Sequence, residues 1–295
     1  MKKILFYVVA GAFLLTVGMT ACKGGGQKPQ KEPTAGGGAF TPEQLGWKLA
    51  VQCWTFKEYT FAEALEKIKE LGVKYVEAYP GQKIGGSYEG TTMYTADSAT
   101  RAAMKTLLDK NGLTLVNYGV VTPKDREGWL QLFDFAKAMG IETINSEPKP
   151  EQMDLVDSLA QAYGINIGIH NHPKPSFYWS PDTVLKYIAG HSDRLGSCAD
   201  VGHWVRSGLD PVECLKKLDG HIKSLHFKDL NEKARKAHDV PWGTGISNVP
   251  AMLQVLKDQG YQGVFSVEYE YHWTSSMPEI RQSLENFRKI VSQLK

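Results

Sequence analysis

Short apolar runs recur along the chain, and each is followed by a polar loop, an amphipathic stretch and a glycine. Such runs predict buried β-strands, and amphipathic stretches with a period of 3.6 residues predict helices. The runs predicted as strands lie at residues 49–56, 75–81, 114–121, 143–148, 165–173, 196–203, 222–229 and 263–270. Eight strands that alternate with eight helices in about 250 residues are typical of a (β/α)8 barrel. We therefore expect an α/β fold, a single-domain (β/α)8 TIM barrel, over residues 44–295.

The first predicted helix carries start and stop signals. Thr60 and Glu63 have the spacing of a capping box, and the apolar residues that follow share one face. Gly72 stands where the end of a helix favours a residue without Cβ. A doubly wound open sheet is the competing fold, but it usually carries a glycine-rich phosphate loop after its first strand. Residues 53–59 contain no such loop, which favours the barrel.

The N-terminal segment has the pattern of an export signal. Residues 1–21 begin with two lysines and continue as an apolar stretch that is too short for a transmembrane helix. Met19 to Cys22 resembles a bacterial lipobox, which predicts lipidation of Cys22. Residues 22–43 are rich in Gly, Lys and Pro and predict a flexible tether. We expect an exported lipoprotein, periplasmic or on the outer-membrane face, that meets the membrane only through its lipid anchor.

Charge and cysteine content narrow the function. The formal net charge is +2 and no basic stripe stands out, which argues against nucleic acid as a partner and against a DNA-directed phosphodiesterase. The cysteines beyond the signal segment, Cys53, Cys198 and Cys214, are widely spaced and predict neither a disulfide framework nor a zinc knuckle. The sequence leaves the oligomeric state open, a homo-oligomer included.

Polar and aromatic residues gather at the ends of the predicted strands. The carboxyl ends of barrel strands meet on one face, where the active sites of this fold are found. Several carboxylates buried together disfavour one another's ionisation, and a divalent cation removes that cost. The residues in question are Trp54, Glu77, Tyr79, Asn117, Tyr118, Glu147, His170, His172, Asp200, His203, His226, Lys228, Glu268 and Glu270. We therefore expect a metal site on this face.

Alternation along each strand selects the side chains that face inward together. The predicted ligands, two imidazoles and two carboxylates, are His170, Asp200, His226 and Glu268. Glu147 is predicted as a fifth ligand or as a base that is not bound to the metal. Nitrogen and oxygen donors without thiolate suit one Mn²⁺, Co²⁺, Zn²⁺ or Mg²⁺ ion.

Four segments carry a resemblance to a known family, namely residues 199–204, 224–229, 238–245 and 261–270. The chain resembles the xylose isomerase-like barrels of the sugar phosphate isomerase/epimerase family, over residues 46–295. The resemblance implies one divalent ion held by the Asp of a D-x-x-H motif, a His on strand seven and a Glu on strand eight. Asp200 with His203, His226 and Glu268 match these features. The chain departs from the family at strand five, where His170 replaces a glutamate that is both ligand and base.

Such a site favours removal of a proton next to a sugar carbonyl, which gives an enediolate. Return of the proton completes an epimerisation or isomerisation, and loss of a β leaving group makes the enzyme a lyase or dehydratase. Glu268 and Glu147 are the candidate catalytic bases. The candidates for substrate binding are His172, His203, Lys228, Trp54 and Trp242.

Export bears on the substrate because sugar phosphates are cytoplasmic metabolites. We expect a metal-dependent isomerase or epimerase that acts on an unphosphorylated sugar or keto-sugar. The alternatives are a lyase or dehydratase acting on a keto-sugar or 3-keto-glycoside, and a non-catalytic sugar-binding lipoprotein.

Overall fold

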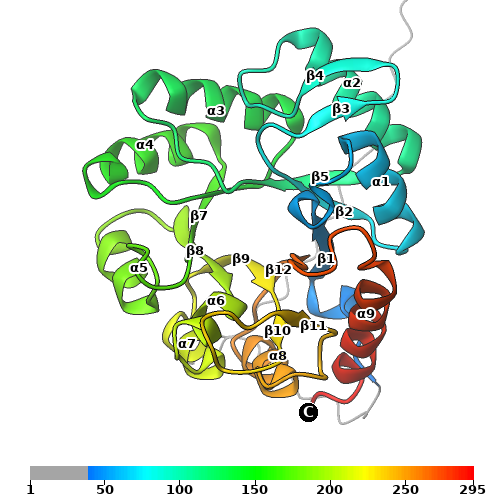
Figure 1. The fold of residues 1–295 in the computed structure, drawn as a ribbon. Coiled ribbons are helices and arrows are strands. Elements are labelled where there is room, and N and C mark those ends of the chain that lie inside the picture. The colour runs from blue at the N-terminus through cyan, green and yellow to red at the C-terminus, as the bar shows by residue number, and fades with distance from the viewer. Residues whose placement is uncertain (1–38) are drawn as a thin grey trace, which may run out of the picture. The chain divides into compact units, whose positions relative to one another are not determined.

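Eight parallel strands close into a barrel in the computed structural model, which describes residues 39–295 (Figure 1). The ring runs β1-β12-β9-β8-β7-β6-β5-β2. Its strands are β1 (Trp47–Gln52), β2 (Tyr75–Ala78), β5 (Thr114–Tyr118), β6 (Thr143–Ser146), β7 (Asn166–His170), β8 (Leu195–Asp200), β9 (Ile222–Phe227) and β12 (Gly263–Val267). The predicted TIM barrel is confirmed. The predicted signal peptide, Cys22 and most of the predicted tether lie outside the described residues.

Helices surround the ring of strands in Figure 1. They are α1 (Phe61–Glu70), α2 (Ser98–Asn111), α3 (Arg126–Met139), α4 (Met153–Tyr163), α5 (Pro181–Ile188), α6 (Val201–Arg206), α7 (Pro211–Lys217), α8 (Val249–Asp258) and α9 (Met277–Val291). Helix α1 begins with the predicted capping box, in which Thr60 accepts from the Glu63 N–H and the Glu63 side chain accepts from the Thr60 N–H. None of the helices described over residues 39–295 combines the length and the apolar character needed to cross a membrane.

Smaller elements lie between the strands and helices of the barrel. Two antiparallel pairs occur, β3 (Lys83–Gly85) with β4 (Tyr88–Thr91) and β10 (Asp229–Leu230) with β11 (Asp239–Val240). The 3-10 helices are η1 (Glu43–Leu45), η2 (Cys53–Phe56) and η3 (Pro150–Gln152). Because η2 directly follows β1 and β10 directly follows β9, with β11 paired to β10, these elements shape the carboxyl end of the barrel.

The segment after β8 differs from the sequence prediction. The sequence placed His203 in a loop, but the structure places it in helix α6. Asp200 causes the difference because its Oδ1 accepts a 2.7 Å hydrogen bond from the backbone N–H of His203 and caps the helix. The D-x-x-H spacing is therefore also an N-cap spacing, which fixes the Asp200 carboxylate at the end of its strand.

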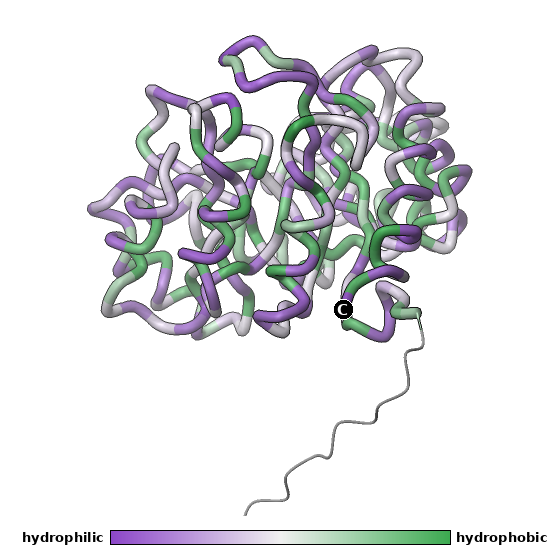
Figure 2. Tube along the Cα trace, turned by 90° about the horizontal axis from the view of Figure 1, so that it is seen from below, coloured by the Kyte–Doolittle hydropathy of each residue, from purple (hydrophilic) through white to green (hydrophobic). Residues whose placement is uncertain are grey.

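The main core lies between the ring of strands and the helices. Apolar and polar positions alternate along the helices in Figure 2, as expected for helices with one buried face. Inside the barrel, Ala50, Val116 and Val264 form a small separate apolar cluster. Nearer the carboxyl ends of the strands, the inward residues are polar and buried, including Glu77, Asn145, Ser224, His226 and Ser266. This change in polarity marks the face that carries the candidate site.

Candidate functional site

Strand register brings the predicted ligands to one place. Asp200 on β8 pairs with His226 on β9, and His226 pairs with Ser266 on β12. Glu268 lies two residues beyond Ser266 and therefore points to the same side of the sheet. His170 ends the neighbouring strand β7.

One potential metal-binding group consists of His170, Asp200, His226 and Glu268, the four residues that the sequence predicted. Each offers one ligand atom, and these atoms lie within 4.8 Å of one another. Nε2 of His170 is 3.7 Å from Oδ2 of Asp200, and Nδ1 of His226 is 3.0 Å from Oε2 of Glu268. All four residues are buried.

The hydrogen bonding of this group fits a cation. Nε2 of His170, Oδ2 of Asp200 and Nδ1 of His226 are buried without a well-formed hydrogen bond within residues 39–295, although Oδ2 lies 2.9 Å from the Lys228 ammonium and Nδ1 lies 3.0 Å from Oε2 of Glu268. Buried polar atoms without partners are costly, so atoms of this kind that face one another require an explanation. One divalent ion bound to all three would remove the cost, and nitrogen and carboxylate donors are suitable ligands for Zn²⁺, Mn²⁺ or Co²⁺.

Electrostatics at the same point also favours positive charge. Burial lowers the pKa of His170, but the nearby carboxylates of Asp200 and Glu147 outweigh burial and raise that pKa to about 10. Burial raises the pKa of Glu268, but His226 and Lys228 lower it well below its usual range. The carboxylates therefore stay ionised and draw protons or cations to this point.

Glu77 on β2 orients His226 from the far side of the imidazole. Nε2 of His226 donates a 2.8 Å hydrogen bond to Oε1 of Glu77, which leaves Nδ1 directed at Glu268. Further hydrogen bonds hold the Glu77 carboxylate, from Asn145 at 2.6 Å and from Ser266 at 2.5 Å. Carboxylate partners of this kind fix the tautomer and the ring orientation of metal-binding histidines.

Glu147 has the same relationship to His170. Its Oε1 lies 3.4 Å from Nδ1 of His170, which leaves Nε2 of that ring for the centre, and it also accepts from Nδ1 of His172. Burial raises the pKa of Glu147, but the two histidines lower it to about 2. The sequence predicted Glu147 as a ligand or base. The structure places it behind His170, outside the four-residue group and in a second group with His170 and His172.

Lys228 does not face a binding pocket. It is fully buried, and its Nζ lies 2.9 Å from Asp200, 2.7 Å from Glu268 and 2.7 Å from Glu270. The predicted contact between Lys228 and sugar hydroxyls has no support in this arrangement, because the ammonium is already surrounded by carboxylates. Arg206 on α6 adds a second cation, 3.1 Å from Glu270.

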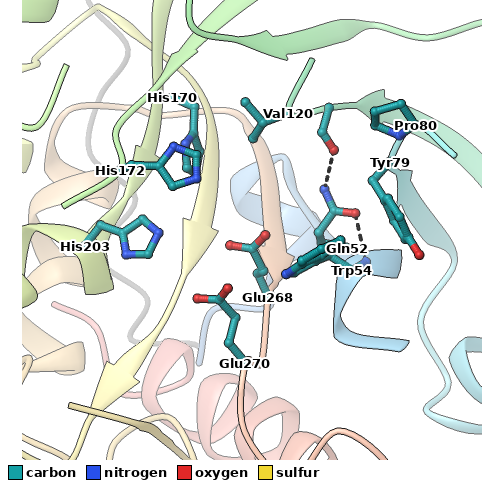
Figure 3. A pocket seen from close by; sticks show the side chains of 11 residues that line it. Gln52, Trp54, Tyr79, Pro80, Val120, His170, His172, His203, Glu268 and Glu270 are labelled. Atoms are coloured by element: carbon teal, nitrogen blue, oxygen red, sulfur yellow. Dashed lines mark hydrogen bonds between the residues drawn. The ribbon is translucent and has the colours of Figure 1, made fainter. Parts of the chain in front are cut away.

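A pocket of about 350 Å³ opens beside the four-residue group (Figure 3). His170, His172 and His203 lie on one side of it and Trp54, Tyr79 and Pro80 on the other, with Glu268 and Glu270 between them in the view. The remaining lining residues are Gln52, Gly119 and Val120, so no Lys or Arg of the described chain lines the pocket. The predicted contacts His172, His203 and Trp54 therefore do face one cavity.

The two predicted tryptophans lie in different environments. Trp54 is 36% exposed, and its ring meets that of Tyr79 edge-on at 5.1 Å. Trp242 is 1% exposed and packs against Phe227 at 5.0 Å and Phe287 at 5.6 Å. Trp242 therefore belongs to the hydrophobic core and does not line the pocket, because the segment after β11 turns its ring toward α9.

Glu77, Glu270 and Arg206 also lie in the candidate site, although the sequence predicted no role for them. Their position as acidic residues at strand ends was the sequence feature that could have indicated a role for Glu77 and Glu270. Their partners, His226 and Lys228, lie on other strands, so the role of each depends on contacts across the barrel. No pattern in the sequence indicated that Arg206 belongs to the site, because it follows His203 in a segment that was not predicted to be helical.

Comparison with known proteins finds relatives and solved structures that cover most of the chain. The chain is 24% identical over 278 residues to inosose dehydratase from Erwinia tasmaniensis, covering 77% of this chain and 88% of that protein. Several other curated relatives match over only 39% to 50% of their own length, whereas an inosose dehydratase from Lacticaseibacillus casei is 23% identical over 276 residues and matches over 87% of its length. A crystal structure of an uncharacterised protein from Parabacteroides distasonis is 37% identical, covers 83% of this chain and 99% of that one, and has a TM-score of 0.69.

A third structure and a family model extend the comparison. The crystal structure of the IolI protein with a bound zinc atom shares the fold, with a TM-score of 0.65, 18% identity, and coverage of 84% of this chain and 99% of that one. The model of the xylose isomerase-like TIM barrel family matches residues 65–290. The match spans most of the barrel and includes all four residues of the potential metal-binding group. The chain therefore belongs to the xylose isomerase-like TIM barrel family.

Proposed function

We propose that this protein is an enzyme that depends on a divalent metal ion and isomerises or epimerises an unphosphorylated sugar or keto-sugar. The observation that carries the proposal is the buried group of His170, Asp200, His226 and Glu268, whose potential ligand atoms lie within 4.8 Å of one another beside the pocket. A purely structural polar cluster would be expected to join these atoms by well-formed hydrogen bonds, which Nε2 of His170, Oδ2 of Asp200 and Nδ1 of His226 do not make within residues 39–295.

His170, Asp200, His226 and Glu268 would hold the ion. Bound there, a divalent ion supplies Lewis-acid stabilisation of the negative charge that develops on the sugar oxygens when a neighbouring C–H bond loses its proton. Glu77 and Glu147 hold the two imidazoles in orientation from behind. The zinc atom bound to IolI, which shares the fold, supports a metal in a barrel of this kind.

Glu268 is the proposed base that takes this proton and so forms the enediolate. It lines the pocket, and both His226 and Lys228 contact its Oε2. As a residue that lines the pocket, Glu268 would be close to a bound sugar. His203 faces Glu268 from the other side of the pocket, and burial lowers the pKa of His203 well below its ordinary value. A neutral imidazole at that position can exchange a proton with a sugar oxygen.

The pocket favours an uncharged substrate. No Lys or Arg of residues 39–295 lines it, and two pocket carboxylates would repel a phosphate group. Trp54 and Tyr79 offer aromatic surface on which a sugar ring can pack. We also propose export through residues 1–21 and lipid anchoring at Cys22, which would place the enzyme where unphosphorylated sugars occur.

Elimination, as in a lyase or dehydratase, is the second candidate function. The observation that favours it is the position of the acidic residues, since Glu268 and Glu270 on the chain after β12 are the only pocket-lining carboxylates of the described residues. Epimerisation is simplest with a base on each face of the substrate, whereas elimination needs one base and one acid. The similarity to an inosose dehydratase supports this candidate.

The test is hydrogen exchange in D₂O, followed by NMR. The purified protein is incubated with free sugars, keto-sugars and 3-keto-glycosides, with Zn²⁺ or with a chelator, and the metal is removed before the spectra are recorded. Deuterium incorporation next to a carbonyl, dependent on metal and lost in His226→Ala, is the expected result. The product then distinguishes isomerisation, epimerisation and elimination.

Two other outcomes would reject the proposal. Exchange that persists unchanged in chelator would show that the four-residue group is not a catalytic metal centre. Sugar binding without exchange or product, and indifferent to metal, would support a non-catalytic sugar-binding protein instead.

A further inference from the structure

Lys228 is built into the interior of the candidate site. Its side chain is fully buried, and its stem passes directly under the first turn of α6. A Cβ added at Gly202 would lie 2.9 Å from both Cβ and Cδ of Lys228, so a glycine at that position makes room for the lysine. The ammonium cannot turn toward solvent without disturbing α6. It is therefore a fixed positive charge of the fold.

The ammonium contacts the same oxygens that face the imidazoles. Nζ lies 2.9 Å from Oδ2 of Asp200, the oxygen next to Nε2 of His170. It also lies 2.7 Å from Oε2 of Glu268, the oxygen next to Nδ1 of His226. A metal ion held by the four-residue group would thus share two oxygens with Lys228.

The charges around Lys228 determine how its ammonium affects metal binding. Asp200, Glu268 and Glu270 surround Lys228, and Arg206 also contacts Glu270, so these three carboxylates already share their charge with two fixed cations before a divalent ion binds. Without the ammonium, the buried carboxylates of Asp200 and Glu268 would lose the cation that contacts both of them, which is strongly destabilising. With both cations present, their mutual repulsion across shared oxygens opposes metal binding.

We propose that Lys228 is a positioning residue with two opposed effects on the metal site. This inference rests on the proposed metal-dependent function. Its ammonium holds Asp200 and Glu268 at ligand spacing before a metal binds, and it limits how tightly the metal is then held. Lys228 thereby stabilises the metal-free protein and keeps its metal exchangeable. A lysine with a purely structural role would not weaken metal binding.

The experiment compares the wild type with Lys228→Met and Lys228→Arg, using the full purified protein after treatment with chelator. Zn²⁺ affinity is measured by calorimetry, and the thermal midpoint is recorded with and without Zn²⁺. We expect Lys228→Met to lower the midpoint of the metal-free protein and to tighten Zn²⁺ binding by about tenfold or more, because the like charge is gone. Lys228→Arg, which keeps the charge, should stay closer to the wild type in Zn²⁺ affinity than Lys228→Met.

Glu270→Gln provides an independent test of Zn²⁺ affinity if Lys228→Met does not fold. It removes one negative charge next to Lys228 and leaves the four-residue group intact, so Zn²⁺ binding should weaken. Equal or weaker Zn²⁺ binding in folded Lys228→Met, or unchanged binding in Glu270→Gln, would overturn this inference alone. A wild-type protein that binds no divalent ion would overturn the proposed function as well.

Discussion

Oε1 of Glu77 on β2 lies 2.8 Å from Nε2 of His226 on β9, and the opposite ring atom of His226 is buried without a hydrogen-bond partner among the described residues. Glu147 and His170 repeat this arrangement on neighbouring strands, with the ring atoms exchanged. Each imidazole thus contacts one carboxylate from behind and turns its other ring nitrogen toward the four-residue group. Both rings therefore direct a nitrogen to one point between the strands.

Neutralising Glu77 should weaken metal binding. In Glu77→Gln, the amide keeps the shape of the side chain but loses the charge that orients and polarises His226, so we expect affinity for Zn²⁺ to fall about 10- to 100-fold. Calorimetric titration of the metal-free protein measures the effect. Glu147→Gln is the matched variant and should weaken binding in the same way through His170. Unchanged affinity in both variants would contradict a metal centre on these two rings.

The two histidines at the end of β7 should differ in their effect on metal affinity. His170 is buried within the four-residue group, whereas the side chain of His172 is 51% exposed and lies outside that group. We expect His170→Ala to reduce Zn²⁺ affinity by about 100-fold or more through loss of a ligand. His172→Ala should change it by less than about tenfold and should mainly weaken sugar binding. Metal content after dialysis and calorimetry distinguish them, and equal losses would count against this division.

Trp54 and Trp242 should separate sugar binding from stability. Trp242→Ala removes a buried ring from contact with Phe227 and Phe287, so we expect a loss of about 3–5 kcal/mol in the free energy of unfolding. Trp54→Ala removes a partly exposed ring at the pocket and should cost much less stability while it weakens sugar binding. Urea unfolding and sugar titrations provide the two measurements. A stable Trp242→Ala protein with impaired sugar binding would reverse this assignment.

Asp239 should make the stability of the metal-free protein depend on pH. Burial raises the pKa of this carboxyl to about 7, and the neighbouring Glu270 and Asp200 act in the same direction against Lys228 and Arg206. The folded state therefore holds a proton that the unfolded state releases near its ordinary pKa of 3.8. The contribution of Asp239 is fully present below that value and is lost as pH rises through about 7.

Asp239→Asn tests this pH dependence. The free energy of unfolding is measured by urea titration with chelator between about pH 5 and pH 8. The wild type should lose stability relative to the variant by at most about 1.4 kcal/mol per pH unit, because one proton is involved. A difference between the two proteins that stays constant with pH would show that Asp239 is ionised throughout.

The fold followed from local patterns in the sequence. Apolar runs predicted all eight barrel strands, and the capping box at Thr60 and Glu63 marks the observed start of α1. These signals depend on neighbours within a few residues, so they can be read without knowing the rest of the structure. Because parallel barrel strands all end on one face, the sequence also determined that His170, Asp200, His226 and Glu268 would meet.

Only the tertiary structure decided what the remaining polar residues contact. Alternation along a strand gives the face of a side chain but not its neighbour across the barrel, which depends on register and closure. That is why Glu77 and His226, 149 residues apart, could not be paired from the sequence. The same reason explains why Glu147 lies behind His170 and why carboxylates from two other strands enclose Lys228. Trp242 lies in the core and Trp54 lies at the pocket. The path of a loop determines whether its aromatic ring is buried, and that path depends on long-range packing.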